Sequence, residues 1–252
     1  MPTPIALQLY TLRNALARDF AGTIRRVAAM GYLGVETINV QGVAPDAAAS
    51  LFEALDLRVP SAHLPLPAGK QAAEVIRTAS ALGCDRIVST LGREFFSSLD
   101  RIRRTCELFN QAVEVAETNG FGFAVHNHWW EFQQVEGRAV YQVLLEELDP
   151  RVVFEIDIYW VKTAGHDPAA VLRQLGARAP LVHVKDGPAV QDAPMVAIGQ
   201  GSLDIPAAIA AAEDAAEWLI VELDHCATDI FEAVERSYAY LVERGLARGR
   251  ER

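Results

Sequence analysis

The chain has 252 residues, of which 51% are hydrophobic and 22% are charged, and its formal net charge is -10. These values are typical of a globular protein with one large α/β domain or two small ones. The acidic balance argues against nucleic acid and anionic membranes as partners, because both repel a negative surface. No apolar run approaches the roughly 20 residues that span a bilayer, and the pattern of a signal peptide is missing.

The cysteines are scattered along the chain, at Cys84, Cys106 and Cys226. Their spacing matches neither a disulfide framework nor a zinc-binding motif. We therefore expect buried thiols in a cytoplasmic protein.

Eight short apolar runs rich in β-forming residues alternate with Ala-rich stretches. In chain order the runs cover residues 5–10, 33–40, 59–64, 85–90, 122–128, 152–158, 181–186 and 218–224. The stretches between them show apolar residues at helical spacing. One such face holds Phe20, Ile24, Val27 and Met30, and a longer one holds Leu99, Ile102, Cys106, Phe109, Val113 and Ala116. Glycines at 31, 83, 120 and 176 suit the left-handed helix ends that precede the next strand.

Strands that alternate with helices favour parallel pairing through right-handed crossovers. Eight such units in this length predict a single-domain (β/α)₈ TIM barrel that covers residues 1–252. The alternative is an open doubly wound sheet. We favour the barrel because no glycine-rich phosphate loop follows any of the early strands.

Polar side chains gather at the ends of the later runs. The sixth run ends in Glu155 and Asp157, the seventh in His183 and Lys185, and the eighth in Glu222 and Asp224; the fifth ends in His126 and His128, with Glu131 just beyond, and the third ends in His63. Active sites of barrels form at the carboxyl ends of the strands. Because residues two apart on a strand share a face, each pair is expected to point the same way.

Several carboxylates buried together would repel one another and become protonated, unless a cation neutralises them. A divalent metal ion is therefore the simplest explanation of this pattern. Each residue also has an ordinary alternative: a strand-end carboxylate is commonly a helix N-cap, and His63 alone could be a hydrogen-bonded core histidine. Trp129 and Trp130 either pack in the protein or form a wall on which a sugar ring stacks.

A set of motifs in the expected order carries a family resemblance. They are LQLYTLR (7–13), GYLGVE (31–36), SAHLPL (61–66), VHNHWWEF (125–132), IDIYWVKTAGHDP (156–168), HVKDG (183–187) and VELDHC (221–226). Together they resemble the xylose isomerase-like TIM barrels, specifically the sugar phosphate isomerase/epimerase family. The resemblance covers nearly the whole chain. It implies a small-molecule sugar or polyol substrate and leaves the formation of a homo-oligomer open, since dimers and tetramers are common among such proteins.

The resemblance also implies one divalent metal ion, Mn, Mg, Co or Zn, held by Glu, Asp, His and Glu at the ends of strands five to eight. The last three ligands fall on Asp157, His183 and Glu222. The chain departs from the pattern at the fifth strand, where His126 takes the place of the usual Glu. The fourth ligand is then Glu131 or His126, and we favour Glu131. Gln200 also replaces the Glu that is common in the GEG sequence of such proteins, and it cannot act as a base.

The expected reaction is proton abstraction next to a carbonyl, with Glu222 as the base and His126 or Glu131 on the opposite face. His63, His128, Glu155 and Lys185 would bind substrate oxygens, and Trp129 would stack on the sugar. Two bases on opposite faces predict an isomerase or epimerase. One base and one acid predict a lyase, such as a dehydratase of inosose or 3-keto-glycoside type. A barrel that binds a sugar without catalysis is the third alternative.

Overall fold

The computed structural model of the protein describes residues 1–38, 42–212 and 214–250. Its barrel strands are β1 (Ile5–Gln8), β2 (Gly34–Glu36), β3 (Ala62–His63), β4 (Arg86–Ser89), β5 (Gly122–His126), β8 (Val153–Asp157), β9 (Leu181–Val184) and β10 (Trp218–Val221). They form one parallel sheet in the order β2-β1-β10-β9-β8-β5-β4-β3. Parallel bridges Gly34 to Arg58 and Thr37 to Ala62 bring the two end strands together. The predicted (β/α)₈ barrel is confirmed.

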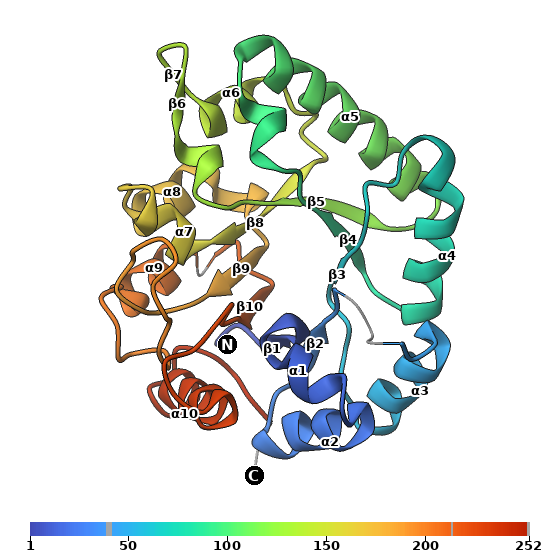
Figure 1. Ribbon diagram of the computed structural model, residues 1–252, viewed down its shortest axis with the longest axis vertical. Helices are drawn as coiled ribbons and strands as arrows, with labels where there is room; N and C mark the ends of the chain where they lie inside the picture. Colours follow the sequence, from blue (N-terminus) through green and yellow to red (C-terminus); the bar gives the residue numbers. More distant parts are fainter. Residues whose placement is uncertain (39–41, 213, 251–252) are drawn as a thin grey trace.

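Helices form an outer ring around the strands (Figure 1). They are α1 (Arg13–Leu16), α2 (Phe20–Met30), α3 (Pro45–Ala54), α4 (Ala72–Leu82), α5 (Leu99–Thr118), α6 (Val140–Glu147), α7 (Ile158–Thr163), α8 (Pro168–Leu175), α9 (Ile205–Ala212) and α10 (Ile230–Glu243). A small antiparallel hairpin, β6 (Gln134–Val135) and β7 (Arg138–Ala139), projects next to α6. Among residues 1–38, 42–212 and 214–250, none of the helices combines the length and apolar character that a bilayer crossing requires.

The predicted strands are longer than the observed ones at their carboxyl ends. The first run was expected to reach Tyr10, but the chain turns into a short 3-10 helix at Leu9. The eighth was expected to reach Asp224, but regular pairing ends at Val221. Part of the second run, residues 39–40, lies outside the described residues. Glu155, Asp157 and His183 therefore lie within the paired strands. Lys185, Glu222 and Asp224 lie just beyond them, in the connections that follow.

Two smaller expectations were wrong. Cys226 is only half-buried, unlike Cys84 and Cys106, because it lies in the connection after β10. Gly176 has a φ of 51° and a ψ of -130°, so it does not adopt the left-handed helical conformation; it is the first residue of a 3-10 turn, Gly176–Arg178. Gly31 and Gly83 do end their helices in the left-handed conformation.

Two apolar layers hold the barrel together. The larger packs between the strands and the helices, and the smaller fills the barrel interior near the amino ends of the strands, with Ala6, Val88, Ala124, Leu181, Trp218 and Ile220. Gly34 belongs to this interior, since a Cβ on it would lie 3.0 Å from the Trp218 ring. Two positions further along the strands, the inward side chains become polar.

A buried carboxylate fixes the long connection between β9 and α9. Asp186 is fully buried, and its two oxygens accept hydrogen bonds from the backbone N–H groups of Gly187, Gly199, Gly201 and Leu203, at 2.8 to 3.2 Å. Gly201 comes so close that a Cβ would lie 2.1 Å from Asp186 Oδ1. The connection that follows Lys185 is thus tied to the carboxyl end of the barrel.

Asp186→Asn turns one acceptor into an N–H donor that faces backbone donors. We expect the free energy of unfolding to fall by about 2–4 kcal/mol, because buried donors lose a charged acceptor. Urea unfolding measures the loss. Asp192→Asn is a matched control in the same connection, since Asp192 is exposed, and we expect a change within about 0.5 kcal/mol. Equal stabilities of the two variants would contradict this role of Asp186.

Candidate metal and substrate site

The polar side chains inside the barrel form two connected clusters at the carboxyl ends of the strands. The inner cluster comprises Glu36, His63, His126, Glu155 and His183. The outer cluster comprises Asp157, Lys185, Glu222 and Asp224. Glu155 and Asp157 are two positions apart on β8, and His183 and Lys185 are two apart at the end of β9. Strand alternation therefore points both members of each pair into the barrel, about 7 Å apart along the strand.

In the inner cluster, two imidazoles lie between two carboxylates. His63 Nε2 is 2.6 Å from Glu155 Oε2 and 3.2 Å from Glu36 Oε1. His183 Nε2 is 2.7 Å from the same Glu36 oxygen and 3.1 Å from the same Glu155 oxygen. The third imidazole, His126, has its Nδ1 3.0 Å from Glu155 Oε2.

Glu36 is a functional candidate that the sequence reasoning missed. It is fully buried at the end of β2, where Gln8 donates a 2.6 Å hydrogen bond to Oε1 and Ser61 donates one to Oε2. The available signal was the alternation Gly34-Val35-Glu36, which points Glu36 to the barrel interior together with Gly34.

In the outer cluster, one ammonium group forms ion pairs with three carboxylates. Lys185 Nζ lies 2.9 Å from Asp157 Oδ2, 2.6 Å from Glu222 Oε2 and 2.8 Å from Asp224 Oδ2. His183 joins the clusters, because its Nδ1 is 2.9 Å from Glu222 Oε2 while its Nε2 faces the inner cluster. The other oxygen of Asp157 caps α7 by accepting from the N–H groups of Tyr159 and Trp160.

Neighbouring charges set the ionisation of these buried groups. Burial alone would raise the pKa of Glu222, but Lys185 and His183 hold that pKa well below its usual range. Likewise His63 and His183 outweigh burial and keep the pKa of Glu36 low. Burial raises the pKa of Asp157 to about 6, although Lys185 opposes the shift.

The imidazoles separate into two kinds. Burial alone would lower the pKa of His63, but Glu36 and Glu155 raise it to about 10. Burial and the neighbouring imidazoles hold the pKa of His126 well below its usual range, and burial and Lys185 lower that of His128 to about 3. At neutral pH His63 is therefore charged, while His126 and His128 are neutral.

Glu131 does not reach either cluster. Its Oε2 accepts from the backbone N–H of His128 at 2.8 Å, and its other oxygen has no hydrogen-bond partner among the described residues. The side chain lines a small apolar space behind the barrel wall with Val125, Phe132, Tyr141, Leu144, Leu145, Phe154, Ile156 and Leu175. The short 3-10 turn at Trp130–Phe132 thus directs Glu131 toward the helices and away from the barrel mouth.

Aromatic rings border the outer cluster on one side. The His128 ring stacks on Trp130 with a centroid distance of 4.1 Å, and Lys185 Nζ lies 5.5 Å from the centroid of Trp160. Trp129 instead contacts Arg93, whose guanidinium carbon is 5.0 Å from the ring centroid. Trp160 thus lies beside Lys185 and Trp130 beside His128, while Trp129 lies beside Arg93.

Within the described part of the chain, two groups of side chains could each hold a metal ion, with their donor atoms within 4.8 Å of one another. One is His63, His126, Glu155 and His183; the other is Asp157, His183 and Glu222. The second group contains the three ligands that the family resemblance implies.

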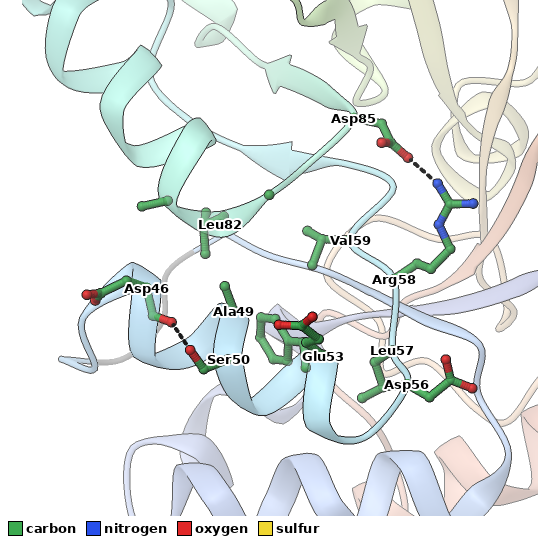
Figure 2. A pocket seen from close by; sticks show the side chains of 13 residues that line it. Asp46, Ala49, Ser50, Glu53, Asp56, Leu57, Arg58, Val59, Leu82 and Asp85 are labelled. Carbon is green, nitrogen blue, oxygen red and sulfur yellow. Dashed lines mark hydrogen bonds and ion pairs between the residues drawn. The ribbon is translucent and has the colours of Figure 1, made fainter.

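A hollow at the other end of the barrel lacks this chemistry. Figure 2 shows it between α3 and α4, where Arg58 and Asp85 form a 3.1 Å ion pair. Its volume is about 530 Å³, and it lies at the amino ends of β3 and β4. Its acidic side chains, which include Asp46 and Glu53, are on open surface, so we place the functional site at the carboxyl ends.

Comparison with known families identifies the family of the chain. Residues 24–241 match the family model described as "Xylose isomerase-like TIM barrel". The chain belongs to this family. A comparison with curated proteins returns no match.

Several solved structures of other proteins show the same fold. A sugar phosphate isomerase/epimerase from Parabacteroides distasonis is 23% identical, with a TM-score of 0.84 and coverage of 98% of this chain and 100% of the other. A probable 3-DHS dehydratase from Bacillus anthracis is 13% identical, with a TM-score of 0.79 and coverage of 96% and 100%. An L-ribulose 3-epimerase is 16% identical, with a TM-score of 0.74 and coverage of 97% and 94%. At these identities the likeness establishes the fold alone.

Glu131 generates a prediction about pH and stability. Burial raises its pKa from the ordinary 4.5 to about 8. Between pH 5 and pH 8 Glu131 holds a proton in the folded protein but releases it in the unfolded chain. The stability that this proton contributes to the folded protein is therefore full below pH 4.5, and it is lost as the pH rises through 8. Glu131→Gln removes this dependence. We expect the variant to gain on the order of 4 kcal/mol relative to wild type from pH 5 to pH 8, measured by urea unfolding. A pH-independent difference would contradict a buried neutral Glu131.

Proposed function

We propose that this protein is a divalent-metal-dependent isomerase or epimerase of a sugar or keto-sugar, which removes a proton next to a carbonyl to form an enediolate. The observation that carries the proposal is the convergence of Asp157, His183 and Glu222 at the mouth of a xylose isomerase-like barrel. The same mouth presents Lys185 and aromatic rings, which suit a small polyol with several oxygens.

The outer cluster fits a divalent cation. Its three carboxylates share one ammonium, which leaves negative charge uncompensated, and the contact of Asp157 Oδ2 at 2.9 Å is to that same shared ammonium. Two carboxylates and one imidazole suit Mn, Mg, Co or Zn. Bound there, the ion would supply Lewis-acid stabilisation of negative charge on substrate oxygens.

The chain's own residues divide the remaining tasks. Glu222 is the proposed base, since its carboxylate is ionised and lies at the barrel mouth. Lys185, 2.6 Å from Glu222, would donate a hydrogen bond to a substrate oxygen and hold it beside the base. Trp130 and Trp160 would exclude water and pack against the carbon skeleton.

The group on the opposite face of the reacting carbon decides the outcome. Glu131 points away from the mouth, so the candidates come from the end of β5: His126 and His128, both neutral imidazoles. A second proton acceptor there gives epimerisation or isomerisation. A dehydratase is the alternative, because the Lys185 ammonium beside Glu222 could protonate a departing hydroxyl group.

An exchange experiment tests the reaction class. The protein is incubated with Mn²⁺ and a panel of pentuloses and hexuloses in deuterated water, and the recovered sugar is examined by NMR. We expect one deuterium at the carbon next to the carbonyl, and a loss of about 10²- to 10⁴-fold in exchange rate for Glu222→Gln. Loss of water in mass spectra would indicate the dehydratase instead. Binding without exchange or water loss would indicate a barrel that only binds sugars.

Metal binding is tested separately from turnover. Asp157→Asn keeps the cap on α7 but removes a charged donor atom, so we expect Mn²⁺ affinity to fall at least about tenfold in calorimetric titration. Asp192→Asn, on an exposed connection, is the control with unchanged affinity. A loss of similar size in Glu131→Gln would return Glu131 to the ligand set.

A further inference from the structure

The proposed function leaves the inner cluster largely unused. Its donor atoms come from five different strands, β2, β3, β5, β8 and β9, and almost all of them are buried. Four of these atoms, on Glu36, His63, Glu155 and His183, form a closed ring of contacts of 2.6 to 3.2 Å. Such a convergence of titratable groups in the core is costly to build and calls for a strong compensating interaction.

Two donor atoms of the cluster have unused capacity. Within the described part of the chain, His126 Nδ1 and Glu155 Oε1 have no hydrogen-bond partner, although both are buried. His126 Nδ1 is 3.0 Å from Glu155 Oε2, but the angles do not make a hydrogen bond. The imidazole nitrogen and the carboxylate are thus close to each other without a hydrogen bond between them. This arrangement is expected when both groups are directed at a third atom, such as a bound ion.

The donor set indicates which atom would fit. Three imidazole nitrogens with one carboxylate, and a second carboxylate at Glu36 beside them, are the ligands that Zn²⁺, Fe²⁺ and Co²⁺ prefer. Mg²⁺ and Ca²⁺ take oxygen donors almost exclusively. The other donor group, Asp157, Glu222 and the shared His183, offers fewer nitrogen atoms and is therefore less selective among divalent ions.

We propose that the inner cluster is a second divalent-metal site, held by His63, His126, Glu155 and His183 and selective for Zn²⁺ or a similar nitrogen-preferring ion. His183 would serve both sites, with Nε2 directed to the inner ion and Nδ1 to the outer cluster. Binding of both ions therefore displaces the N–H protons of the ring into solvent. This inference extends the proposed function and shares His183 with it, but it requires no turnover.

The second site has a chemical consequence for the reaction. If His126 bound the ion through Nδ1, its Nε2 would carry the N–H, and the ring would have no lone pair left to accept a proton from substrate. The imidazole that remains available on the β5 side is then His128, which stacks on Trp130 at the barrel mouth.

Metal stoichiometry tests the inference. Untagged protein is stripped with a chelator and titrated with Zn²⁺ by calorimetry, and with Co²⁺ by visible absorption. We expect two equivalents of Zn²⁺, and a Co²⁺ spectrum in which a nitrogen-rich site of low coordination number gives the stronger band. A single equivalent of either ion in the wild type would overturn the second site, and would favour a metal-free network in which protonated His63 and His183 balance Glu36 and Glu155.

Variants assign the two equivalents. His63→Asn and His126→Asn should each lose one equivalent and the stronger Co²⁺ band, while Asp157→Asn should lose the other equivalent. His225→Asn, on an exposed side chain, should keep both. Two equivalents in both inner variants would overturn the assignment. An unchanged outer equivalent in Asp157→Asn would contradict the proposed function and leave the inner site intact. Circular dichroism shows whether each variant is folded. If a variant is unfolded, the stoichiometry of the wild type decides the question.

Discussion

The structure depends on keeping two buried carboxylates, Glu36 and Glu155, next to each other in the barrel interior. Neither could stay ionised there alone, because burial in a low-dielectric interior strongly penalises charge. His63 and His183 lie between them and make the pair tolerable. Their shared contacts connect strands on opposite sides of the sheet opening, since β2 and β3 reach β8 and β9 through this one cluster.

The same cluster orients the outer one. Glu36 Oε1 holds the His183 ring at Nε2, which leaves Nδ1 facing Glu222. Glu36 is itself held by Gln8 at the end of β1 and by Ser61 just before β3, so the orientation of the His183 ring depends on these two residues as well. Outer partners of this kind set the tautomer and direction of a metal-ligating imidazole. The geometry at the mouth is thus decided one layer deeper in the barrel.

Much of the fold could be predicted from sequence, because alternation of apolar runs and helical faces is a property of consecutive residues. The lengths of the strands could not be predicted, because a strand ends where its hydrogen bonds to the neighbouring strand end. The run after Trp218 reads as strand through Asp224, yet pairing stops at Val221. The common direction of the polar pairs on the later strands was predictable, because side chains continue to alternate between the two faces for a few residues beyond the last paired one.

The fifth strand shows where sequence reasoning about the site fails. In VHNHWWEF the distance from His126 to Glu131 allows the carboxylate to return to the mouth or to face the helices, and sequence spacing does not distinguish the two. The 3-10 turn decides it, and places Glu131 against apolar side chains where its pKa rises to about 8. A carboxylic acid that is neutral at pH 7 is a poor metal ligand and a poor base at the same time. The end of this strand therefore offers imidazole nitrogens where a carboxylate was expected, and nitrogen donors suit ions such as Zn²⁺ and Fe²⁺ better than Mg²⁺.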